Sequence, residues 1–350
     1  MNYSTDNTRI IDKVDLVTPN DVISKYPLTD EISKLVYGTR NEVSQILHGK
    51  DDRLIAVVGP CSIHDPDSAE EYAKLLIDEK KKYEEDILLI MRVYFEKPRT
   101  SIGWKGLIND PDMDNTFDAN KGLFLARSIL HKISKLGLPV GTEFLDPISP
   151  QFVADLVSWG AIGARTAESQ IHRELASGLS CPIGFKNGTT GDLNPAIYGI
   201  KASNHSHVFF SNTKDGMVSI YKTSGNSDTH IILRGGTKPN LYPDDIRETI
   251  DALNEAEAND SIMIDVSHGN SQKVFKRQLE NISVVSKQIS DGMNEIRGVM
   301  IESHLREGNQ KIGEVLQYGQ SITDACIDFD DTKRCLSELS SAVQARRSKS

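Results

Sequence analysis

Residues 87–100 read ILLIMRVYFEKPRT, a run of five apolar residues followed by three cations, Arg92, Lys97 and Arg99. The apolar half shows no alternation of polar and apolar positions, which is typical of a parallel strand buried on both faces. The cations stand at or just beyond the carboxyl end of that strand. A solvated charge patch would also explain them, so the rest of the chain must decide between the two interpretations.

Seven further apolar runs of the same kind recur along the chain. They read LIAVVG, LPVGTEFL, AIGA, PIGF, HIILRGG, SIMIDV and GVMIES. Amphipathic stretches with capping residues or a closing glycine lie between them, for example 120–137, 148–160 and 242–258. Eight strands at a mean spacing of about 34 residues favour an α/β protein with a (β/α)8 TIM barrel. A doubly wound open sheet is the alternative, but no GxGxxG follows the first strand.

Two segments do not fit the barrel repeat. Residues 1–50 are polar and read as an arm followed by two helices, one starting near Pro19 and the other near Thr29 and ending at Gly49. Residues 206–223 contain two β-rich runs and predict an inserted β-hairpin. We therefore expect an N-terminal extension over 1–50, with a role in assembly or regulation, and a catalytic barrel over 51–350 that the hairpin interrupts.

Composition excludes several classes of protein. The 350 residues include 40 Lys and Arg against 50 Asp and Glu, a net charge of −10, which disfavours a surface that wraps nucleic acid. The four cysteines form no CxxC pair and are too few for a disulfide framework. The first residues lack the pattern of a signal peptide, and no apolar run approaches the roughly 18 residues of a membrane span. We expect a cytoplasmic protein with no nucleic-acid and no membrane partner.

Each predicted strand supplies one chemically active side chain at or just beyond its carboxyl end, where TIM barrels build their sites. The eight are Cys61, Arg92, Glu143, Arg165, Lys186, Arg234, His268 and Glu302. Each alone has an ordinary explanation, as an inert core thiol, a structural ion-pair partner or a hydrogen-bonded core histidine. Their repetition in phase with eight strands favours a site, because burying unpaired charge is costly.

The strand-end residues divide into two chemical groups. The cations suit a small ligand with several negative charges, and the glycines of LRGGT and FKNGTTG would let the backbone approach a phosphate. The second group is Cys61, His268, Glu302 and one acid of SITDACIDFDD. One thiolate, one imidazole and two carboxylates suit a divalent transition metal ion such as Mn²⁺, Fe²⁺, Co²⁺ or Zn²⁺. Spacing alone does not say which acid takes part.

Longer motifs carry a resemblance over the whole chain. They include GPCSIHD, MRVYFEKPRTSIGWKGLINDP, GTEFLDPISPQ, WGAIGARTAESQIHRELASGLS, GFKNGTTG, DVSHGNSQK, IESHLREGNQ and YGQSITDACI. In these the chain resembles the type I 3-deoxy-D-arabino-heptulosonate 7-phosphate (DAHP) synthases, the feedback-regulated enzymes that open the shikimate pathway of aromatic amino acid biosynthesis. The resemblance implies a metal-dependent condensation of phosphoenolpyruvate with erythrose 4-phosphate, with release of inorganic phosphate, on a (β/α)8 barrel.

The resemblance also implies roles for individual residues. The metal ligands would be Cys61, His268, Glu302 and Asp324. The phosphoenolpyruvate site would be Arg92, Lys97, Arg165, Lys186 and Arg234, with Glu143, Gly163 and Ala164 nearby. The aldehyde's phosphate would bind Arg99 and Thr100. Either Lys186 or Lys97 would transfer a proton, with a pKa that we expect to be lowered by neighbouring cations.

Family members of this length are usually inhibited by one aromatic amino acid. The matching pocket residues are Asp6, Asn7, Pro150, Gln151, Leu175, Leu179, Ser180, Phe209, Ser211 and Tyr221. Phenylalanine is the expected effector, ahead of tyrosine and tryptophan, although Asn7 replaces a usual acid and Tyr221 is bulkier than the family pattern. The resemblance further implies a homodimer or a tetramer built from dimers.

Three other functions remain as alternatives. A related synthase would condense phosphoenolpyruvate with arabinose 5-phosphate, which the KPRT motif and the arm disfavour. An aldolase would instead form a Schiff base through Lys186. A non-catalytic amino-acid sensor would be expected to have lost one or more strand-end residues, yet all eight are present.

Overall fold

A closed barrel of eight parallel strands organises the chain in the computed structural model, which describes residues 3–97, 103–313 and 315–349. The strands, in order around the barrel, are β1 (Leu54–Gly59), β2 (Ile87–Arg92), β3 (Val140–Glu143), β4 (Trp159–Ile162), β5 (Ile183–Lys186), β8 (Thr229–Leu233), β9 (Ile262–Asp265) and β10 (Ile296–Glu302). Strand β1 pairs with both β2 and β10, which closes the sheet. The predicted TIM barrel is therefore confirmed, and the open-sheet alternative is wrong.

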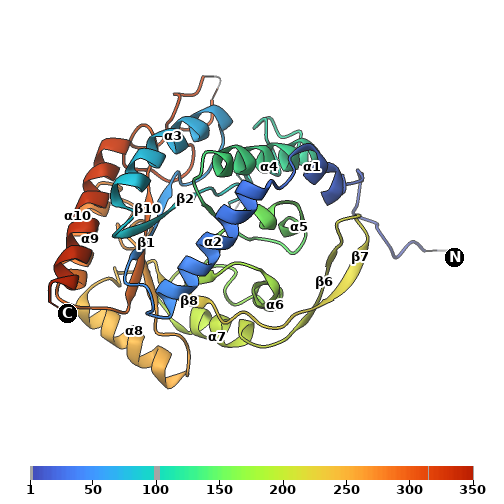
Figure 1. The fold of residues 1–350 in the computed structure, drawn as a ribbon. Coiled ribbons are helices and arrows are strands. Elements are labelled where there is room, and N and C mark those ends of the chain that lie inside the picture. The colour runs from blue at the N-terminus through green and yellow to red at the C-terminus, as the bar shows by residue number, and fades with distance from the viewer. Residues whose placement is uncertain (1–2, 98–102, 314, 350) are drawn as a thin grey trace.

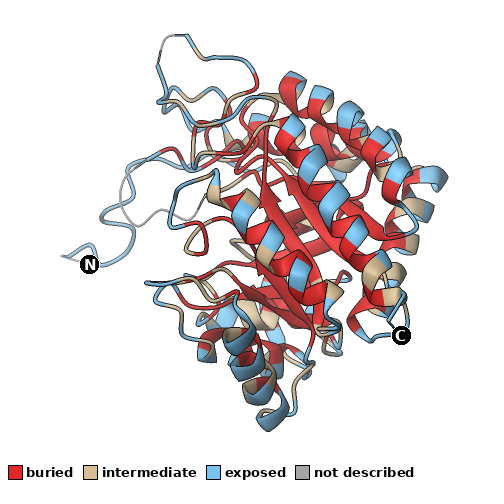
Figure 2. Cartoon of the chain, turned by 90° about the vertical axis from the view of Figure 1, so that its left-hand side faces the viewer, coloured by how far each residue is buried: buried red, intermediate tan, exposed pale blue. Residues whose placement is uncertain are grey.

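Helices cover the outside of the barrel and alternate with its strands. They are α3 (Pro66–Tyr83), α4 (Ala119–Lys135), α6 (Gln170–Gly178), α7 (Asn194–Ser203), α8 (Pro243–Glu255), α9 (Arg277–Ser290) and α10 (Phe329–Arg347). Figure 2 shows buried strands inside and helices whose outer faces are exposed. Among the described residues, no helix is long and apolar enough to cross a bilayer.

The segment 148–160 differs from the single helix that its amphipathic pattern predicts. It forms a four-residue helix, α5 (Pro150–Val153), a 3-10 turn, η1 (Ala154–Leu156), and the start of β4. Arg40 explains where the helix stops, because its guanidinium donates to the carbonyl oxygens of Ala154 and Val157, each at 2.7 Å. A continuing helix would use these acceptors for its own hydrogen bonds.

The N-terminal extension forms the two predicted helices, α1 (Pro19–Lys25) and α2 (Asp30–Leu47). Thr29 caps α2 by accepting from the backbone N–H of Ile32. At the other end of the helix, Val43, Ile46 and Leu47 pack with side chains of the barrel interior. Helix α2 therefore covers the amino-terminal end of the barrel, across which it runs in Figure 1.

The predicted insertion is an antiparallel hairpin of β6 (Val208–Asn212) and β7 (Val218–Lys222), placed between α7 and β8. Along β6 the residues alternate in burial, with Phe209 and Ser211 turned inward and Phe210 exposed. Figure 1 shows the hairpin extending from the barrel toward α1 and the N-terminal arm. Asn20 on α1 contacts the hairpin turn through a 2.7 Å hydrogen bond to Asp215.

His230 of β8 is a titratable ring buried in the barrel interior. Its Nε2 accepts a hydrogen bond from Trp159 Nε1 at 3.0 Å, and the residue is fully buried. Burial disfavours the charged imidazolium and lowers the pKa of His230 to about 4.

This histidine should make the fold sensitive to acid. An unfolded chain has a histidine pKa of about 6.5, so as the pH falls toward 4 protons bind the unfolded state first and stability is lost. Replacing His230→Gln keeps a hydrogen-bond acceptor without titration and should reduce the loss between pH 6.5 and 4.5 by about 2–3 kcal/mol. Urea denaturation at the two pH values measures this. The exposed His205→Gln variant is the control, and an identical pH slope in wild type and His230→Gln would contradict the prediction.

Candidate active site

The carboxyl ends of the barrel strands surround one cavity of about 600 Å³. Most of the predicted site residues line it together: Arg92, Lys97, Glu143, Gly163, Ala164, Arg165, Lys186, Arg234, His268, Glu302 and Asp324. They come from seven strand ends and from the loop after β10. Arg99 and Thr100, expected at the aldehyde's phosphate, lie outside the described residues.

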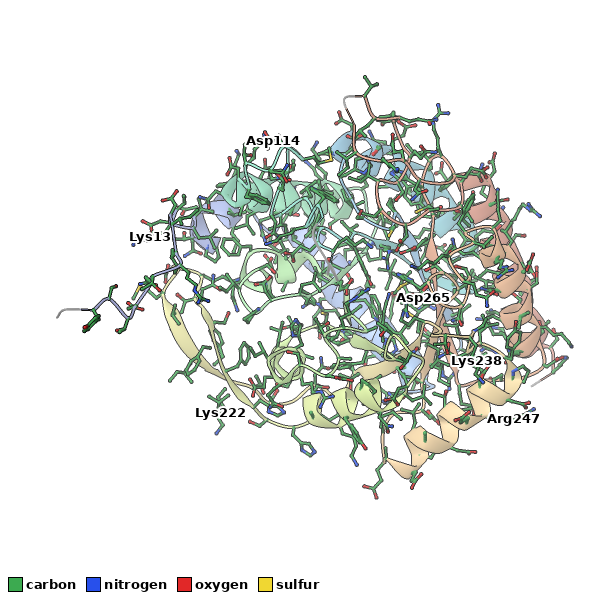
Figure 3. All side chains as sticks on the ribbon, turned by 180° about the vertical axis from the view of Figure 1, so that it is seen from behind. Lys13, Asp114, Lys222, Lys238, Arg247 and Asp265 are labelled. Atoms are coloured by element: carbon green, nitrogen blue, oxygen red, sulfur yellow. The ribbon has the colours of Figure 1, made fainter. Side chains whose placement is uncertain are left out.

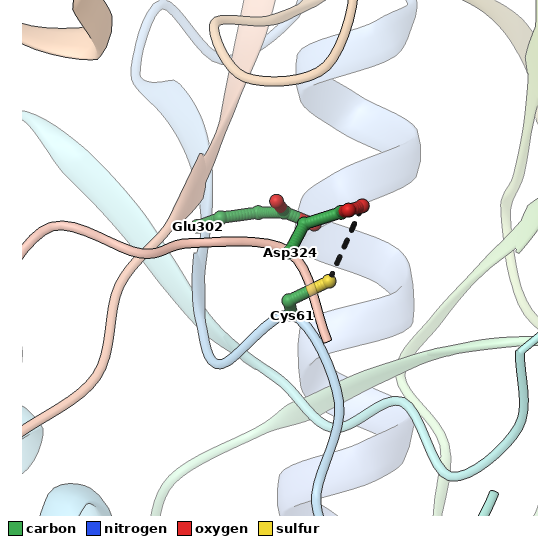
Figure 4. A group of neighbouring side chains, drawn as sticks. All are labelled: Cys61, Glu302 and Asp324. Carbon is green, nitrogen blue, oxygen red and sulfur yellow. Dashed lines mark hydrogen bonds between the residues drawn. The ribbon is translucent and has the colours of Figure 1, made fainter. Parts of the chain in front are cut away.

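Cys61, Glu302 and Asp324 form a tight cluster at the site, in which Cys61 and Glu302 are buried and Asp324 is exposed. One potential ligand atom from each lies within 4.8 Å of the others, and Cys61 Sγ is 3.8 Å from an Asp324 oxygen (Figure 4). Burial, with Glu302 nearby, raises the pKa of the Cys61 thiol to about 11. Burial also opposes ionisation of Glu302, but the His268 and Arg92 charges outweigh it and lower the Glu302 pKa to about 2.

His268 stands beside this cluster and points its Nε2 at it. That atom is 3.5 Å from Glu302 Oε1, while Nδ1 is 2.8 Å from Asp265 Oδ2. His268 is not part of the group whose ligand atoms all lie within 4.8 Å of one another. Its contact with that group is the one to Glu302. A thiol, an imidazole and two carboxylates that converge in this way fit a divalent transition metal ion, because soft, intermediate and hard donors are all present.

Lys97 contacts the thiol directly, with Nζ 2.8 Å from Cys61 Sγ. The expectation of a lowered lysine pKa is wrong for this residue. Burial disfavours its charge, but the neighbouring Cys61 and Glu302 outweigh burial and Arg92, so the pKa of Lys97 is raised. Lys97 is therefore a charged ammonium group that can bind an anion or donate a proton.

Arg92 lies under the cluster and is fully buried. Its Nη2 is 2.9 Å from Glu302 Oε1, and its guanidinium stacks 3.6 Å from the centre of the Tyr94 ring. The Tyr94 ring supports the guanidinium, and the ion pair holds the Glu302 carboxylate in place. Tyr94 was not among the residues predicted from the sequence, because an aromatic residue after an apolar run resembles any core residue.

Asp265, the last residue of β9, is a further site residue that the sequence analysis missed. Its Oδ2 lies 3.0 Å from Lys186 Nζ and 2.8 Å from His268 Nδ1. Burial opposes its ionisation, yet the charges of His268 and Lys186 hold the pKa of Asp265 well below its usual range. Its position at the end of a strand was the available signal, but His268 was the residue assigned to that strand end.

Glycines shape the wall of the cavity where backbone and side chains approach closely. A Cβ on Gly163 would lie 2.1 Å from Glu143 Oε1, so any side chain there would displace Glu143. Gly235 of the LRGGT motif has φ +73°, and a Cβ would lie 2.4 Å from the Asn270 backbone nitrogen. Only glycine fits such a position without strain. Arg234 is held next to it by a hydrogen bond from its backbone N–H to Asn187.

A second cavity of about 600 Å³ lies between α2, α5, α6 and the hairpin. It contains seven of the predicted regulatory residues: Pro150, Gln151, Leu175, Leu179, Ser180, Phe209 and Tyr221. Ser211 is buried nearby and donates to the Pro147 carbonyl oxygen. Asp6 and Asn7 do not line this cavity and are exposed on the N-terminal arm.

Comparison with known proteins agrees with the site. The model of the DAHP synthetase I family matches residues 27–337. This chain belongs to the DAHP synthetase I family. It is 53% identical over 349 residues to the Escherichia coli K12 "Phospho-2-dehydro-3-deoxyheptonate aldolase, Phe-sensitive", covering 99% of this chain and 100% of the relative. It is 50% identical over 344 residues to the Trp-sensitive enzyme of Salmonella typhimurium, covering 98% and 99%.

A solved structure of the same family shows the same fold. The phospho-2-dehydro-3-deoxyheptonate aldolase from Francisella tularensis SCHU S4 superimposes with a TM-score of 0.95 at 51% identity, covering 97% of this chain and 99% of that one. The resemblance inferred from the motifs is thus confirmed as family membership.

Proposed function

We propose that this chain is a DAHP synthase, which condenses phosphoenolpyruvate with erythrose 4-phosphate and releases inorganic phosphate, the first step of the shikimate pathway. One observation carries the proposal: a single cavity holds six lysine and arginine side chains beside a cluster of thiol, imidazole and carboxylate groups. The cations suit two phosphorylated substrates and the cluster suits a divalent metal ion. Membership of the DAHP synthetase I family supports the same conclusion.

The proposed roles follow from where the side chains lie. Arg165, Lys186 and Arg234 face the cavity from three neighbouring strand ends and would bind the phosphate and carboxylate of phosphoenolpyruvate. Arg92 and Lys97, at the edge of the metal cluster, would hold the same substrate next to the aldehyde. Fixing both reactants in one orientation removes an entropic part of the barrier. Arg99 and Thr100 would bind the aldehyde's phosphate.

A metal ion held by Cys61, His268, Glu302 and Asp324 would act as a Lewis acid toward the aldehyde oxygen. The bond forms between C3 of phosphoenolpyruvate and the aldehyde carbon, water adds at C2, and phosphate leaves. Lys97, which the surrounding anions keep charged, is the proposed proton donor, with Lys186 as the alternative. The Schiff-base mechanism is disfavoured, because the Lys186 ammonium is paired with Asp265 rather than free as an amine.

We further propose that the second cavity binds an aromatic amino acid as an inhibitor, with phenylalanine ahead of tyrosine and tryptophan. Leu175, Leu179 and Phe209 provide an apolar surface for its ring. Tyr221 stacks on Phe209 at a centroid distance of 5.9 Å and donates to the Asn212 carbonyl oxygen. Its hydroxyl is thus already bonded, which favours an apolar ring over one that brings a second hydroxyl.

We also propose a homodimer, or a tetramer of dimers, in the cytoplasm. The outer face of the hairpin exposes Val208, Phe210, Val218 and Ile220, each between 55 and 78% accessible. Neighbouring apolar residues of the arm, such as Ile11, are exposed as well. Such a patch suits burial against a second copy. Residues 1–50 and the hairpin would thus serve assembly and regulation, while the barrel over 51–350 carries the chemistry.

The reaction is tested by phosphate release from phosphoenolpyruvate and erythrose 4-phosphate. The wild type should release phosphate only with both substrates present, and a chelator should stop the reaction until Mn²⁺ or Co²⁺ is restored. Replacing Cys61→Ala should lower kcat/KM by at least about 100-fold, because a metal ligand is lost. Cys181→Ala, another buried cysteine outside the cavity, is the matched control. Full activity of Cys61→Ala after metal depletion would refute the metal assignment.

The regulatory site is tested by inhibition with the three aromatic amino acids. Phenylalanine should inhibit at the lowest concentration. Leu179→Asp places a charge against the apolar surface and should raise the inhibition constant by about ten-fold or more. Leu75→Asp, an exposed leucine of α3, should leave inhibition unchanged. Absence of any response to all three amino acids would contradict the regulatory proposal.

Assembly is tested by sedimentation equilibrium. The wild type should sediment as a dimer or tetramer, and Phe210→Glu should shift it toward smaller species because a charge would be buried in the interface. Tyr198→Glu changes another exposed aromatic residue, on α7, and should have no effect. A wild type that sediments as a monomer at micromolar concentration would disprove the proposal.

A further inference from the structure

Asp265 occupies a position between the two halves of the site that no step of the reaction uses. Figure 3 shows it inside the molecule, whereas labelled charges such as Lys222 and Arg247 lie at the periphery. It is completely buried at the end of β9. A buried carboxylate without partners would be costly, yet both oxygens of Asp265 are bonded.

Each oxygen of the Asp265 carboxylate has its own pair of partners. Oδ1 accepts from the backbone N–H of Ser267 at 3.0 Å and from its hydroxyl at 2.6 Å. Oδ2 lies 2.8 Å from His268 Nδ1 and 3.0 Å from Lys186 Nζ. The first pair fixes the carboxylate in the turn after β9. The second pair joins a residue of that turn to a residue of β5.

The contact of Asp265 with His268 Nδ1, together with the Ser267 hydroxyl 2.7 Å from the same nitrogen, determines which ring nitrogen faces the metal cluster. An imidazole that donates Nδ1–H to a carboxylate presents the lone pair of Nε2, and Nε2 is the atom that lies 3.5 Å from Glu302 Oε1. His268 also has φ +48°, a left-handed backbone that is unusual for a residue other than glycine. Strain of this kind persists where the surroundings hold it, and Asp265 is one of the groups that do so.

The contact with Lys186 acts on the other half of the cavity. Lys186 is almost fully buried and lines the cavity wall. Its four-carbon chain is flexible, so the ion pair with Asp265 limits where its ammonium group can lie. One carboxylate oxygen therefore holds a proposed metal ligand and a proposed phosphate-binding cation at once.

We propose that Asp265 is a positioning residue that couples the metal site to the phosphoenolpyruvate site, by holding the His268 ring with Nε2 toward the ligand cluster and the Lys186 ammonium in the cavity. This inference rests on the proposed function. Asp265→Asn tests it with an almost identical shape. An amide has only one accepting oxygen, so in either orientation its NH₂ group faces donors, either those of Ser267 or those of His268 and Lys186.

The experiment titrates metal-free protein with Co²⁺ and follows the absorption of the Co²⁺–thiolate bond to Cys61, which needs no catalysis. Asp265→Asn should keep this band but weaken the Co²⁺ dissociation constant by about 10–100-fold. At saturating Co²⁺ its kcat should recover to within a few-fold of wild type, while the KM for phosphoenolpyruvate stays about ten-fold higher. If Asp265 only stabilised the fold, the folded fraction of the variant would keep the wild-type Co²⁺ dissociation constant and the wild-type KM for phosphoenolpyruvate.

Asp86→Asn is the matched control. Asp86 is also buried and hydrogen-bonded, to Ser340, Gln344 and Arg347, but it does not line the cavity. This variant should lose stability and keep both constants. Ser267→Ala removes the hydroxyl contacts to Asp265 Oδ1 and to His268 Nδ1 and leaves the Asp265 carboxylate in place. It should shift both constants in the same direction by about three-fold, and it decides the question if Asp265→Asn does not fold.

Three results would overturn the inference. One is that Asp265→Asn, or Ser267→Ala if the first variant is unfolded, binds Co²⁺ and phosphoenolpyruvate as the wild type does. Another is that Asp86→Asn loses both affinities to the same extent, which would make the effect a general one. The third is a wild type that binds no Co²⁺ through Cys61, which removes the metal site itself and so marks a failure of the proposed function rather than of the coupling alone.

Discussion

The pairing of β1 with β10 closes the barrel, and the geometry of the site depends on that closure. In this register Gly59 is opposite Glu302, so the turn that carries Cys61 lies beside the Glu302 carboxylate although the two residues are far apart in the chain. Two isolated bridges in the loop after β10, between 303 and 327 and between 308 and 326, return the chain so that Asp324 reaches the same point. An open sheet would leave these groups at opposite edges.

Closure of the barrel brings many charged side chains together at one rim. Within the site, each of three cations lies against an acidic group. Arg92 lies against Glu302, Lys186 against Asp265, and Lys97 against the Cys61 sulfur. Buried pairs of this kind add little net stability, so their value lies in fixing where each group stands. Because the chain as a whole is acidic, binding of anionic substrates depends on cations held locally in the cavity, and the paired carboxylates hold them there.

The sequence predicted the barrel and most of the site because parallel strands put their carboxyl ends at one rim. Residues that follow apolar runs, such as Arg92, Lys186 and Arg234, could therefore be assigned without knowing any contact. Asp265 also ends a strand, but that position does not distinguish it from His268 three residues later. Its importance lies in contacts with His268 and Lys186, and contacts across a barrel have no signature in spacing. The helix predicted over 148–160 failed for a similar reason, because Arg40 from a distant helix binds its carbonyl groups.

The two ends of the barrel also differ in their energetics. At the rim with the site, His268, Gln272 and Lys273 have left-handed backbones with φ between +48° and +61°, and each such residue costs about 1–3 kcal/mol. At the opposite end, the apolar side chains of α2 complete the barrel core, and full burial of each contributes about 1.5–3 kcal/mol. The apolar end therefore offsets the strain at the site. Helix α2 belongs to the N-terminal extension in the sequence, but its apolar side chains are part of the barrel core. The stability that this core provides allows the barrel to keep strained and charged residues at the opposite rim.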